Sequence, residues 1–416
     1  MAADLYDPDQ YVAGVPHALL ARLRREEPVY WQELPAEPSG SSAEPSGSSA
    51  CRGYWALLKH ADVAAASADP ATFSAARGGI VIEDQEPEQL ARMRMMLLCM
   101  DPPRHGPLRR VVLDAFTPGR IQAMEPWLRE RTRALLDAAA ARCAAGGELD
   151  FVRDLAGALP MQALAQMMAI PDTEQARLVA LGDRIIGRTD PDFAAPDGEG
   201  DPHVELGALG FQLACERQGR GGDDLISILL RAESDGRPLE PVDFAALFVQ
   251  IAVAANETTR TLLSGALLAL LEHPGAWRAL AADPSLLPTA VEEMLRWVTP
   301  VHYFRRTATR DVVLRGHRIR AGDRVVLHYT SANFDEEVFA EPYRFDVCRD
   351  PNPHLAFGFG EHFCLGARLA RLEARVFFEE LLGRFAGAEL TGPPRRLRSN
   401  LNNAWKAIPL RLVARA

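Results

Sequence analysis

The sequence lacks the features that mark nucleic-acid-binding, disulfide-stabilised and membrane-spanning proteins. Its 46 Lys and Arg are outnumbered by 56 Asp and Glu, a net charge of −10, so there is no basic excess for binding nucleic acid. Its six cysteines are scattered without a Cys-x-x-Cys pair, which argues against a zinc ribbon and a disulfide framework. There is no uncharged apolar run of about 18 residues and no basic or apolar leader. We therefore expect a cytoplasmic protein with no membrane segment and no nucleic-acid partner.

What the sequence does contain is helical patterning. Apolar residues recur at intervals of three and four in 122–144, 172–187, 243–272 and 286–297, which predicts four long helices. Short strand patterns occur at 28–31, 54–58, 312–314 and 324–327. Residues 36–50 duplicate a seven-residue Ser/Gly/Pro-rich unit, and we expect a flexible hairpin tip there rather than a domain boundary. The expected fold is mainly α, one large helical domain over residues 1–416 with small β-sheets.

The segment from Phe357 to Gly366, F-G-F-G-E-H-F-C-L-G, is the most specific pattern in the chain. Gly358 and Gly360 allow a tight turn and close approach of the backbone to a flat ligand. Cys364 stands at the start of an amphipathic helical pattern, where the helix dipole and free N–H groups lower the pKa of a thiol. This favours the thiolate, the form that binds metal. A buried structural cysteine beside a glycine turn is the alternative.

This segment resembles the haem-thiolate loop of the cytochrome P-450 family, Phe-x-x-Gly-x-x-x-Cys-x-Gly, and matches it at Phe357, Gly360, Cys364 and Gly366. The resemblance implies the cytochrome P-450 fold and a haem b (iron protoporphyrin IX) cofactor, with Cys364 as the proximal ligand of the iron. A thiolate in that place pushes electron density onto the iron and favours cleavage of the O–O bond. Phe357 and Gly358 would then form part of the cofactor site.

A polar cluster, A-A-N-E-T-T-R at 254–260, interrupts the apolar helix predicted for 243–272. A threonine hydroxyl here can bond to the carbonyl four residues earlier and bend the helix, which opens a groove. A bend without a catalytic role is the alternative. The cluster resembles the family's oxygen-activation motif, (Ala/Gly)-Gly-x-(Asp/Glu)-Thr. This implies that Glu257 and Thr258 are the acid–alcohol pair that supplies protons. Ala255 stands where the family usually has glycine, so its methyl group narrows the expected groove.

Two residues on one predicted helix face form a candidate structural pair. Glu293 and Arg296 are three residues apart and can form an ion pair. They resemble the family's Glu-x-x-Arg pair, which implies a third member in a later Pro-x-Arg-Phe segment. Arg344, in P-Y-R-F at 342–345, fits that segment and is the expected partner.

Four cationic or imidazole side chains match the family's contacts with haem propionates. His105 and Arg109 lie four residues apart on one helix face. Arg306 and His362 match the remaining contacts. Taken singly, each is better explained as a surface cation or a hydrogen-bonded histidine, and only the combination with Cys364 favours the propionate contacts.

Together the matches imply a bacterial-type haem-thiolate monooxygenase that uses O2 to hydroxylate an apolar small molecule. A peroxide-driven or non-redox haem-thiolate enzyme and a haem sensor are the alternatives, and retention of Glu257 and Thr258 favours the O2-dependent enzyme. About fifty residues follow Cys364, too few for a flavin reductase, so we expect a monomer that receives electrons from a ferredoxin or flavodoxin and its NAD(P)H reductase. A basic stripe would bind this donor; the alternative is a solvated face. The stripe comprises Arg368, Arg371 and Arg375, and the balancing acids would be Glu373, Glu379 and Glu380.

The expected substrate pocket is apolar, as ligand pockets usually are. The resemblance implies a substrate of the steroid or terpenoid class, and a secondary-metabolite intermediate or a fatty acid is the alternative. The residues expected to line the pocket are Ile80, Val81, Ala254, Val301 and Leu401.

Overall fold

The computed structural model describes residues 4–35, 53–193, 200–231, 233–234 and 236–415. It is mainly helical, as predicted. Helices of the middle and C-terminal parts of the chain include α7 (Glu125–Ala144), α8 (Ala158–Met168), α9 (Asp172–Ile186), α10 (Pro202–Arg217), α12 (Pro241–Glu272), α13 (Pro274–Ala282), α14 (Leu287–Val298) and α16 (Ala367–Arg384). The others include α1 (Asp9–Val12), α2 (His17–Glu26), α3 (His60–Ser67), α4 (Pro87–Met93), α5 (His105–Ala115), α6 (Pro118–Ala123), α11 (Leu225–Arg231) and α15 (Tyr329–Ala332).

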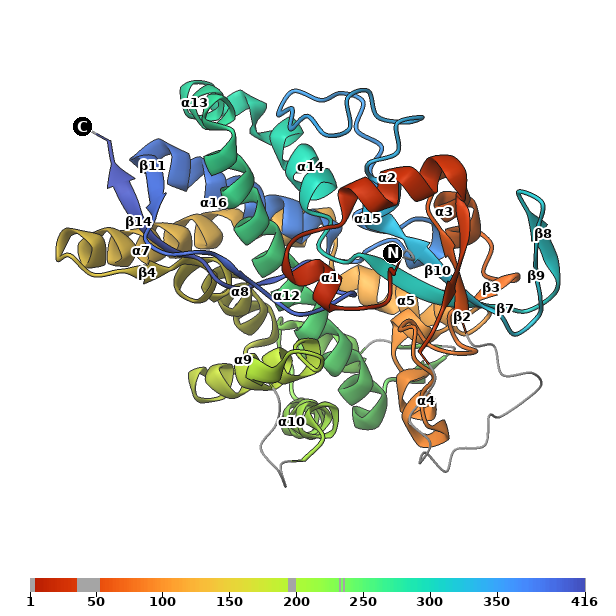
Figure 1. The fold of residues 1–416 in the computed structure, drawn as a ribbon. Helices are drawn as coiled ribbons and strands as arrows, with labels where there is room; N and C mark the ends of the chain where they lie inside the picture. Colours follow the sequence, from red (N-terminus) through yellow and green to blue (C-terminus); the bar gives the residue numbers. More distant parts are fainter. Residues whose placement is uncertain (1–3, 36–52, 194–199, 232, 235, 416) are drawn as a thin grey trace.

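The strands form one larger sheet and several small ones (Figure 1). The larger sheet has the order β1 (Val29–Glu33), β2 (Gly53–Leu57), β10 (Arg324–His328), β7 (Tyr303–Ala308) and β3 (Phe73–Ser74). The small sheets contain β11 (Phe385–Leu390) with β14 (Pro409–Ala414) and β4 (Leu149–Asp150), β12 (Arg395–Arg396) with β13 (Trp405–Ala407), β5 (Glu233–Ser234) with β6 (Arg237–Pro238), and β8 (Val312–Leu314) with β9 (His317–Ile319). The larger sheet lies away from α7, whereas β11, β14 and β4 lie beside α7 and α16.

Each of the four predicted helices and the four predicted strands is present, with ends shifted by no more than a few residues. The predicted hairpin is also present, because β1 and β2 pair antiparallel with Val29 opposite Leu57 and Glu33 opposite Gly53. Its proposed flexible tip, residues 36–50, lies outside the described residues.

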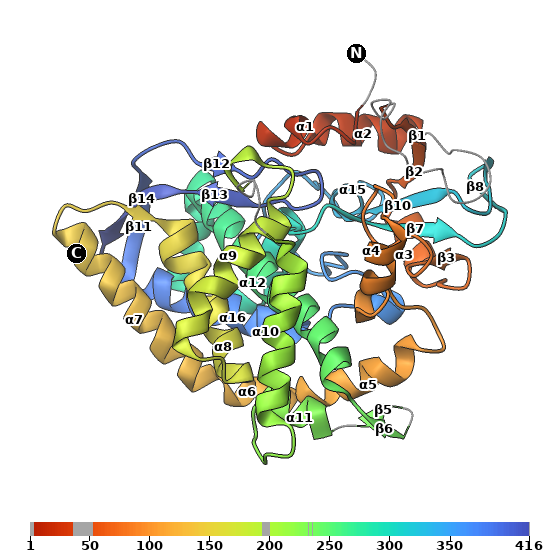
Figure 2. The same cartoon turned by 90° about the horizontal axis from the view of Figure 1, so that it is seen from below.

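Helix α12 passes through the middle of the molecule, with helices on several sides of it (Figures 1 and 2). Its first half, including Phe244 and Phe248, belongs to one hydrophobic core cluster, and its second half, including Leu262 and Leu267, belongs to another. A helix that is apolar on most faces is stable only when it is buried in this way. The polar cluster of residues 256–260 lies between the two apolar halves.

The structural pair on α14 is formed as predicted, but its third member is different. Arg296 Nε and Nη2 each donate to a carboxylate oxygen of Glu293 at 2.8 Å, and both side chains are fully buried. The guanidinium that completes the site is that of Arg349, whose Nε lies 3.1 Å from Glu293 Oε2. Arg344 was the wrong choice. It ends a surface turn that begins at Glu341, and its largely exposed side chain pairs with Glu341 at 3.2 Å.

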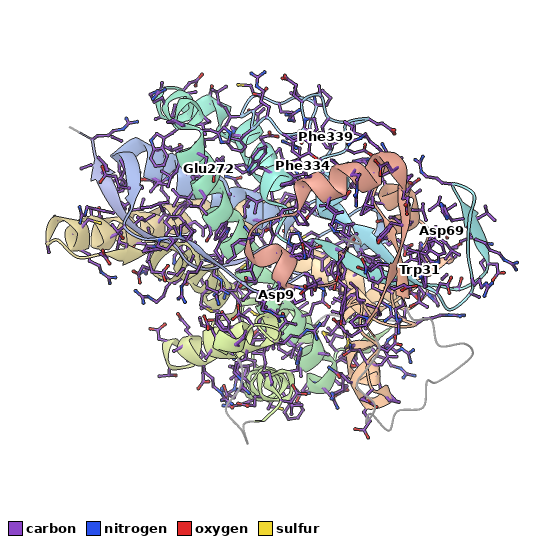
Figure 3. The ribbon with its side chains drawn as sticks, viewed as in Figure 1. Asp9, Trp31, Asp69, Glu272, Phe334 and Phe339 are labelled. Carbon is purple, nitrogen blue, oxygen red and sulfur yellow. The ribbon has the colours of Figure 1, made fainter. Side chains whose placement is uncertain are left out.

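Aromatic rings enclose the buried Arg296. Its guanidinium carbon lies 5.0 Å from the ring centre of Phe334 and 5.3 Å from that of Phe339, and Figure 3 shows these two rings near α2. Cation–π contacts of a desolvated guanidinium are worth about 2 kcal/mol. The ion pair between Glu293 and Arg349, together with these rings around Arg296, therefore connects α14 to the chain segment that leads towards Cys364.

None of the described helices is long and apolar enough to cross a membrane.

Candidate functional site

A tight loop positions Cys364 just before α16. Gly358 and Gly360 both have a φ of 71°, a left-handed conformation that favours glycine. A Cβ atom on Gly360 would also lie only 2.8 Å from the carbonyl oxygen of Ser67, so this position has no room for a side chain. The loop closes where Cys364 N donates to Phe357 O at 2.9 Å. The turn expected from the glycine spacing is confirmed.

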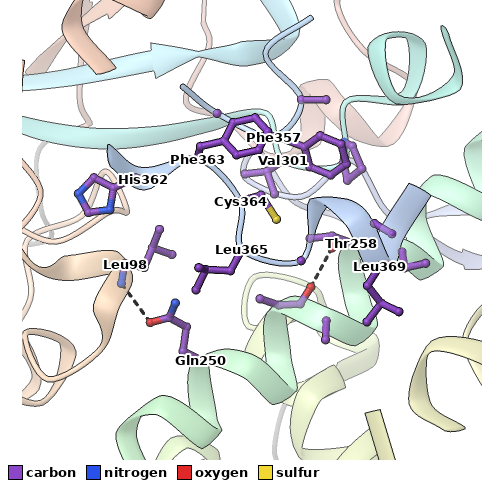
Figure 4. Close-up of a pocket in the computed structure, with 18 of the residues that line it drawn as sticks. Leu98, Gln250, Thr258, Val301, Phe357, His362, Phe363, Cys364, Leu365 and Leu369 are labelled. Carbon is purple, nitrogen blue, oxygen red and sulfur yellow. Dashed lines mark hydrogen bonds between the residues drawn. The ribbon is translucent and has the colours of Figure 1, made fainter. Parts of the chain in front are cut away.

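The thiol of Cys364 lies on the wall of a largely apolar cavity (Figure 4). Burial raises the pKa of the thiol above its ordinary value, although the N–H groups of Gly366 and Ala367 and the guanidiniums of Arg109 and Arg371 act in the opposite direction. The expected lowering of the pKa is therefore not observed, because desolvation outweighs the helix terminus. A metal ion at the sulfur would displace this proton, since the thiolate is the form that binds metal.

Helix α12 forms the wall of the cavity that faces Cys364. Ala254, Ala255 and Thr258 all line it. The hydroxyl of Thr258 donates to the carbonyl oxygen of Ala254 at 2.8 Å, which is the back-bond predicted from the sequence (Figure 4). An exposed hydroxyl thus stands on an apolar helix face, opposite the sulfur.

Glu257 lies behind this wall rather than in it. Its carboxylate is buried and pairs with Arg260, and it accepts a hydrogen bond from Thr261 Oγ1 at 3.3 Å. Arg260 also contacts Asp183 of α9, whose Oδ1 lies 2.7 Å from Arg260 Nη1. Burial raises the pKa of Glu257, while the positive charge of Arg260 opposes that rise. The acid and the alcohol are therefore neighbours in sequence but lie on different sides of the helix.

Two imidazoles with an unsatisfied nitrogen lie at another edge of the cavity. The rings of His105 and His362 are 4.4 Å apart, both line the cavity, and the Nε2 atom of each is buried without a partner among the described residues. Burial and nearby positive charge lower the pKa of His105 to about 4 and that of His362 to about 2. Arg109 lines the cavity as well, and its guanidinium donates to Phe363 O.

The fourth predicted cation, Arg306 of β7, is buried but does not line the cavity. It lies near both imidazoles, since its positive charge contributes to the lowered pKa of each. Phe357 and Gly358 line the cavity as predicted. The residues that the sequence grouped as cofactor contacts are thus brought together.

The predicted substrate pocket is only partly correct. Ala254 and Val301 line the cavity, whereas Ile80, Val81 and Leu401 do not. These residues are held elsewhere, because β7 and the residue before it donate hydrogen bonds to the backbone carbonyls of their two segments. Arg305 N donates to Ile80 O at 2.8 Å and His302 N to Leu401 O at 2.7 Å.

Sequence reasoning missed two polar residues that line the cavity, Gln250 and Glu373. Gln250 could have been found from its position, since it precedes Ala254 and Thr258 at intervals of four on one helix face. Glu373 carried no such signal. It was considered as part of a solvated face, but it is buried, and burial raises its pKa to about 8.

The predicted basic stripe is largely neutralised. Arg371 makes a two-pronged ion pair with Glu292 of α14 at 2.6 and 2.7 Å, and its guanidinium lies 4.6 Å from the ring centre of Phe357. Arg375 pairs with Glu125 of α7 at 2.6 Å. Of the predicted basic stripe, only Arg368 is left as an exposed cation without an ion pair to the described residues.

Comparison with known proteins places this geometry in a family. Residues 215–409 match the family model for cytochrome P450. The chain is 41% identical to a methyl-branched lipid omega-hydroxylase of Mycobacterium tuberculosis, over 94% of this chain and 89% of the relative. It is 36% identical to a linalool 8-monooxygenase of Pseudomonas putida, over 99% and 98% of the two chains, and 35% identical to a steroid C26-monooxygenase of Rhodococcus jostii, over 97% and 83%.

Among solved structures, the chain is similar to a Mycobacterium marinum cytochrome P450 in complex with pseudoionone. The TM-score is 0.88 at 36% sequence identity, with 99% of this chain and 98% of the other covered. Both the fold and the sequence are therefore shared over nearly the whole length. The chain belongs to the cytochrome P450 family and is a cytochrome P450 monooxygenase.

Proposed function

We propose that this enzyme uses O2 and externally supplied electrons to hydroxylate an apolar steroid, terpenoid or methyl-branched lipid. The observation that carries the proposal is the placement of Cys364 and Thr258 on facing walls of one apolar cavity. This cavity draws on residues from Leu97 to Glu373, which supports the proposal that the chain is a single catalytic domain.

The cofactor we propose is haem b, and the residues fit it. The unpartnered Nε2 atoms of His105 and His362, with the guanidinium of Arg109, offer donors for carboxylate groups at one edge of the cavity. Cys364 offers a sulfur ligand on its floor. When bound there, haem would supply the iron chemistry that cleaves O2 and inserts one oxygen atom into a C–H bond.

The chain's own contribution to the reaction is a proton at the hydroxyl of Thr258. That hydroxyl donates to Ala254 O and retains acceptor capacity towards the cavity. Glu257 is the nearest carboxyl in sequence, and burial raises its pKa, which favours the protonated form that can supply a proton. Arg260 and Asp183 connect this buried carboxyl to the surface of α9. The presence of both Glu257 and Thr258, the acid–alcohol pair, favours O2 over peroxide as the oxidant.

The proposed electron donor is a ferredoxin or flavodoxin with its NAD(P)H reductase, which supports a cytoplasmic location. Arg368, on the exposed side of α16 just after Cys364, is the cation that would meet an acidic donor. The ion-paired Arg371 and Arg375 instead fasten α16 to α14 and α7.

The substrate class is supported by the relatives and by the cavity. The three relatives act on a methyl-branched lipid, a steroid and linalool, and the walls formed by Leu98, Ile251, Val301 and Phe304 are apolar. Such walls favour a hydrocarbon body by burial of apolar surface. A fatty acid or a secondary-metabolite intermediate is the second candidate, because both also present long apolar surfaces.

The test is a titration of the purified holoenzyme with one steroid, one terpenoid, one methyl-branched fatty acid and one straight-chain fatty acid. Displacement of water from the iron shifts the absorption spectrum and reports binding directly. Each ligand that binds is then incubated with ferredoxin, its reductase and NAD(P)H, and the product is identified by mass spectrometry. Oxidation of the straight-chain acid alone would contradict the proposed class. A reduced, carbon-monoxide-treated sample without a thiolate-type band would contradict Cys364 as the ligand.

A further inference from the structure

A single amide side chain interrupts the apolar first half of α12. Gln250 stands in the run L-F-V-Q-I-A-V at 247–253, where its neighbours belong to the hydrophobic core. It lines the same cavity as Ala254 and Thr258, which follow it at intervals of four residues. A polar group on an otherwise apolar face is costly unless it is hydrogen-bonded or used.

One end of this amide is held by the main chain. Leu98 N donates to Gln250 Oε1 at 3.0 Å, and Figure 4 shows this hydrogen bond at the edge of the cavity. Because an N–H group can pair only with an oxygen acceptor, this contact fixes which end of the amide is which. The Nε2 group, with its two donor hydrogens, must point the other way.

That donor end is free. Nε2 makes no hydrogen bond to any residue in the described part of the chain, and it faces the space between Leu98 and Leu365 in Figure 4. The surrounding walls, formed by Leu97, Leu98 and Ile251, provide no acceptor side chain. The cavity therefore presents one oriented donor in an apolar region.

We propose that Gln250 is a specificity-determining residue whose Nε2 donates a hydrogen bond to an oxygen atom of the substrate. The preferred substrate would then be an apolar molecule that carries one hydroxyl, carbonyl or carboxyl group. This inference rests on the proposed function, and it adds a polar contact that fixes how the apolar body lies in the cavity.

The spacing along α12 also sets a distance. Eight residues separate Gln250 from Thr258, which corresponds to about 12 Å along the helix axis. An extended carbon chain covers this length in about ten bonds at ~1.2 Å per bond. An oxygen held by Gln250 would place the carbon about ten bonds away beside Thr258, where oxygen insertion is proposed. The distance favours attack near the far end of the molecule.

The experiment compares two probes of the same shape, 2-tridecanone and 2-methyltridec-1-ene, in which a CH2 group replaces the carbonyl oxygen. Dissociation constants are measured by absorption titration of the holoenzyme, for the wild type and for Gln250→Leu. We expect the ratio of the two constants to change by about three- to tenfold in Gln250→Leu, because one net hydrogen bond to the ketone is lost. The hydration free energy of each probe is the same in both titrations, so it cancels when the ratio for the variant is compared with the ratio for the wild type.

A second variant distinguishes the role of the amide oxygen from that of the amide nitrogen. Gln250→Glu keeps an oxygen acceptor for Leu98 N–H but replaces the donor, so it should lose the ketone preference as Gln250→Leu does. An unchanged ratio in both variants, or equal weakening of both probes in Gln250→Leu, would overturn the proposal and leave Gln250 as a tether for the Leu98 segment. Hydroxylation of the ketone should become less selective in position in both variants.

These readouts distinguish the inference from the proposed function. The ratio depends on binding alone, so it can be measured even if neither probe is oxidised. Conversely, oxidation of both probes with an unchanged ratio would contradict the role of Gln250 and leave the monooxygenase activity intact.

Discussion

The hydroxyl of Thr258 donates to the carbonyl oxygen of Ala254 at 2.8 Å, one turn earlier in α12. This bond uses the hydroxyl proton locally and leaves the oxygen lone pairs directed to the cavity that Cys364 also lines. A small motif thereby gives an apolar wall an oxygen that can accept a hydrogen bond from a proton-carrying group in the cavity.

Replacing Thr258 by valine should uncouple electron consumption from product formation. Valine keeps the shape but has no hydroxyl, and positioned proton donors contribute about 10²–10⁴-fold to rates. We expect product formation to fall by roughly 10²-fold while NAD(P)H oxidation continues and hydrogen peroxide accumulates. Thr258→Ser is the matched control and should retain most of the product yield. Equal coupling in both variants would contradict the role of the hydroxyl.

Replacing Arg349 by alanine should destabilise the protein far more than replacing Arg344. Arg349 neutralises the fully buried Glu293, and removing one partner of a buried ion pair costs about 3–5 kcal/mol. Arg344 is largely exposed, and a surface substitution of this kind changes stability by about 0.5 kcal/mol or less. Thermal unfolding of the two variant holoenzymes checks this. Similar losses in both would restore Arg344 as a partner of the buried site.

Acid should destabilise the fold through a group of buried histidines. Burial lowers the pKa of His17 to about 4 and that of His328 to about 3, and it lowers that of His302 well below its ordinary value. The unfolded chain binds protons below about pH 6.5 that the folded chain does not, so stability falls as the pH drops from about 6.5 towards 4.

His17→Phe provides the test of this pH dependence. The variant has one proton fewer to take up on unfolding, so its loss of unfolding temperature between pH 7 and pH 5 should be smaller than that of the wild type. His203→Gln, at a partly exposed position of α10, is the control. If both variants follow the wild-type slope, His17 does not contribute to the acid sensitivity.

Charge reversal at Arg368 should weaken reduction by a ferredoxin. A surface cation in a docking face acts mainly on the association rate, so Arg368→Glu should slow reduction at low salt and approach the wild type as salt increases. Arg318→Glu reverses an exposed charge on β9 and serves as the control. Stopped-flow reduction measured from low to high salt checks the prediction, and no difference between the variants at low salt would argue against this docking face.

Local patterns in the sequence were enough to predict much of the site. The glycine turn, the position of Cys364 before α16 and the Thr258 back-bond each depend on residues within about ten positions of one another. The same holds for the long helices, whose apolar spacing follows directly from the helical repeat.

Contacts between distant segments could not be predicted in this way. Arg349 rather than Arg344 reaches Glu293, although the two arginines are only five residues apart and only one follows the family pattern. The partners Glu292 and Glu125, which neutralise most of the predicted basic stripe, come from helices far from α16 in the sequence.

The sequence by itself thus determined where the helices form, which cysteine lies in a tight loop at a helix start, and which threonine bonds to the carbonyl four residues earlier in α12. These features arise from backbone geometry and hydrogen bonds within a few residues. Only the tertiary structure decided that burial raises the pKa of Cys364, that Arg368 alone of its stripe stays unpaired among the described residues, and that Gln250 turns its donor end to the cavity. The physical reason is that desolvation, ion pairing and hydrogen bonding between segments depend on distances in space, which the order of residues along a chain does not contain.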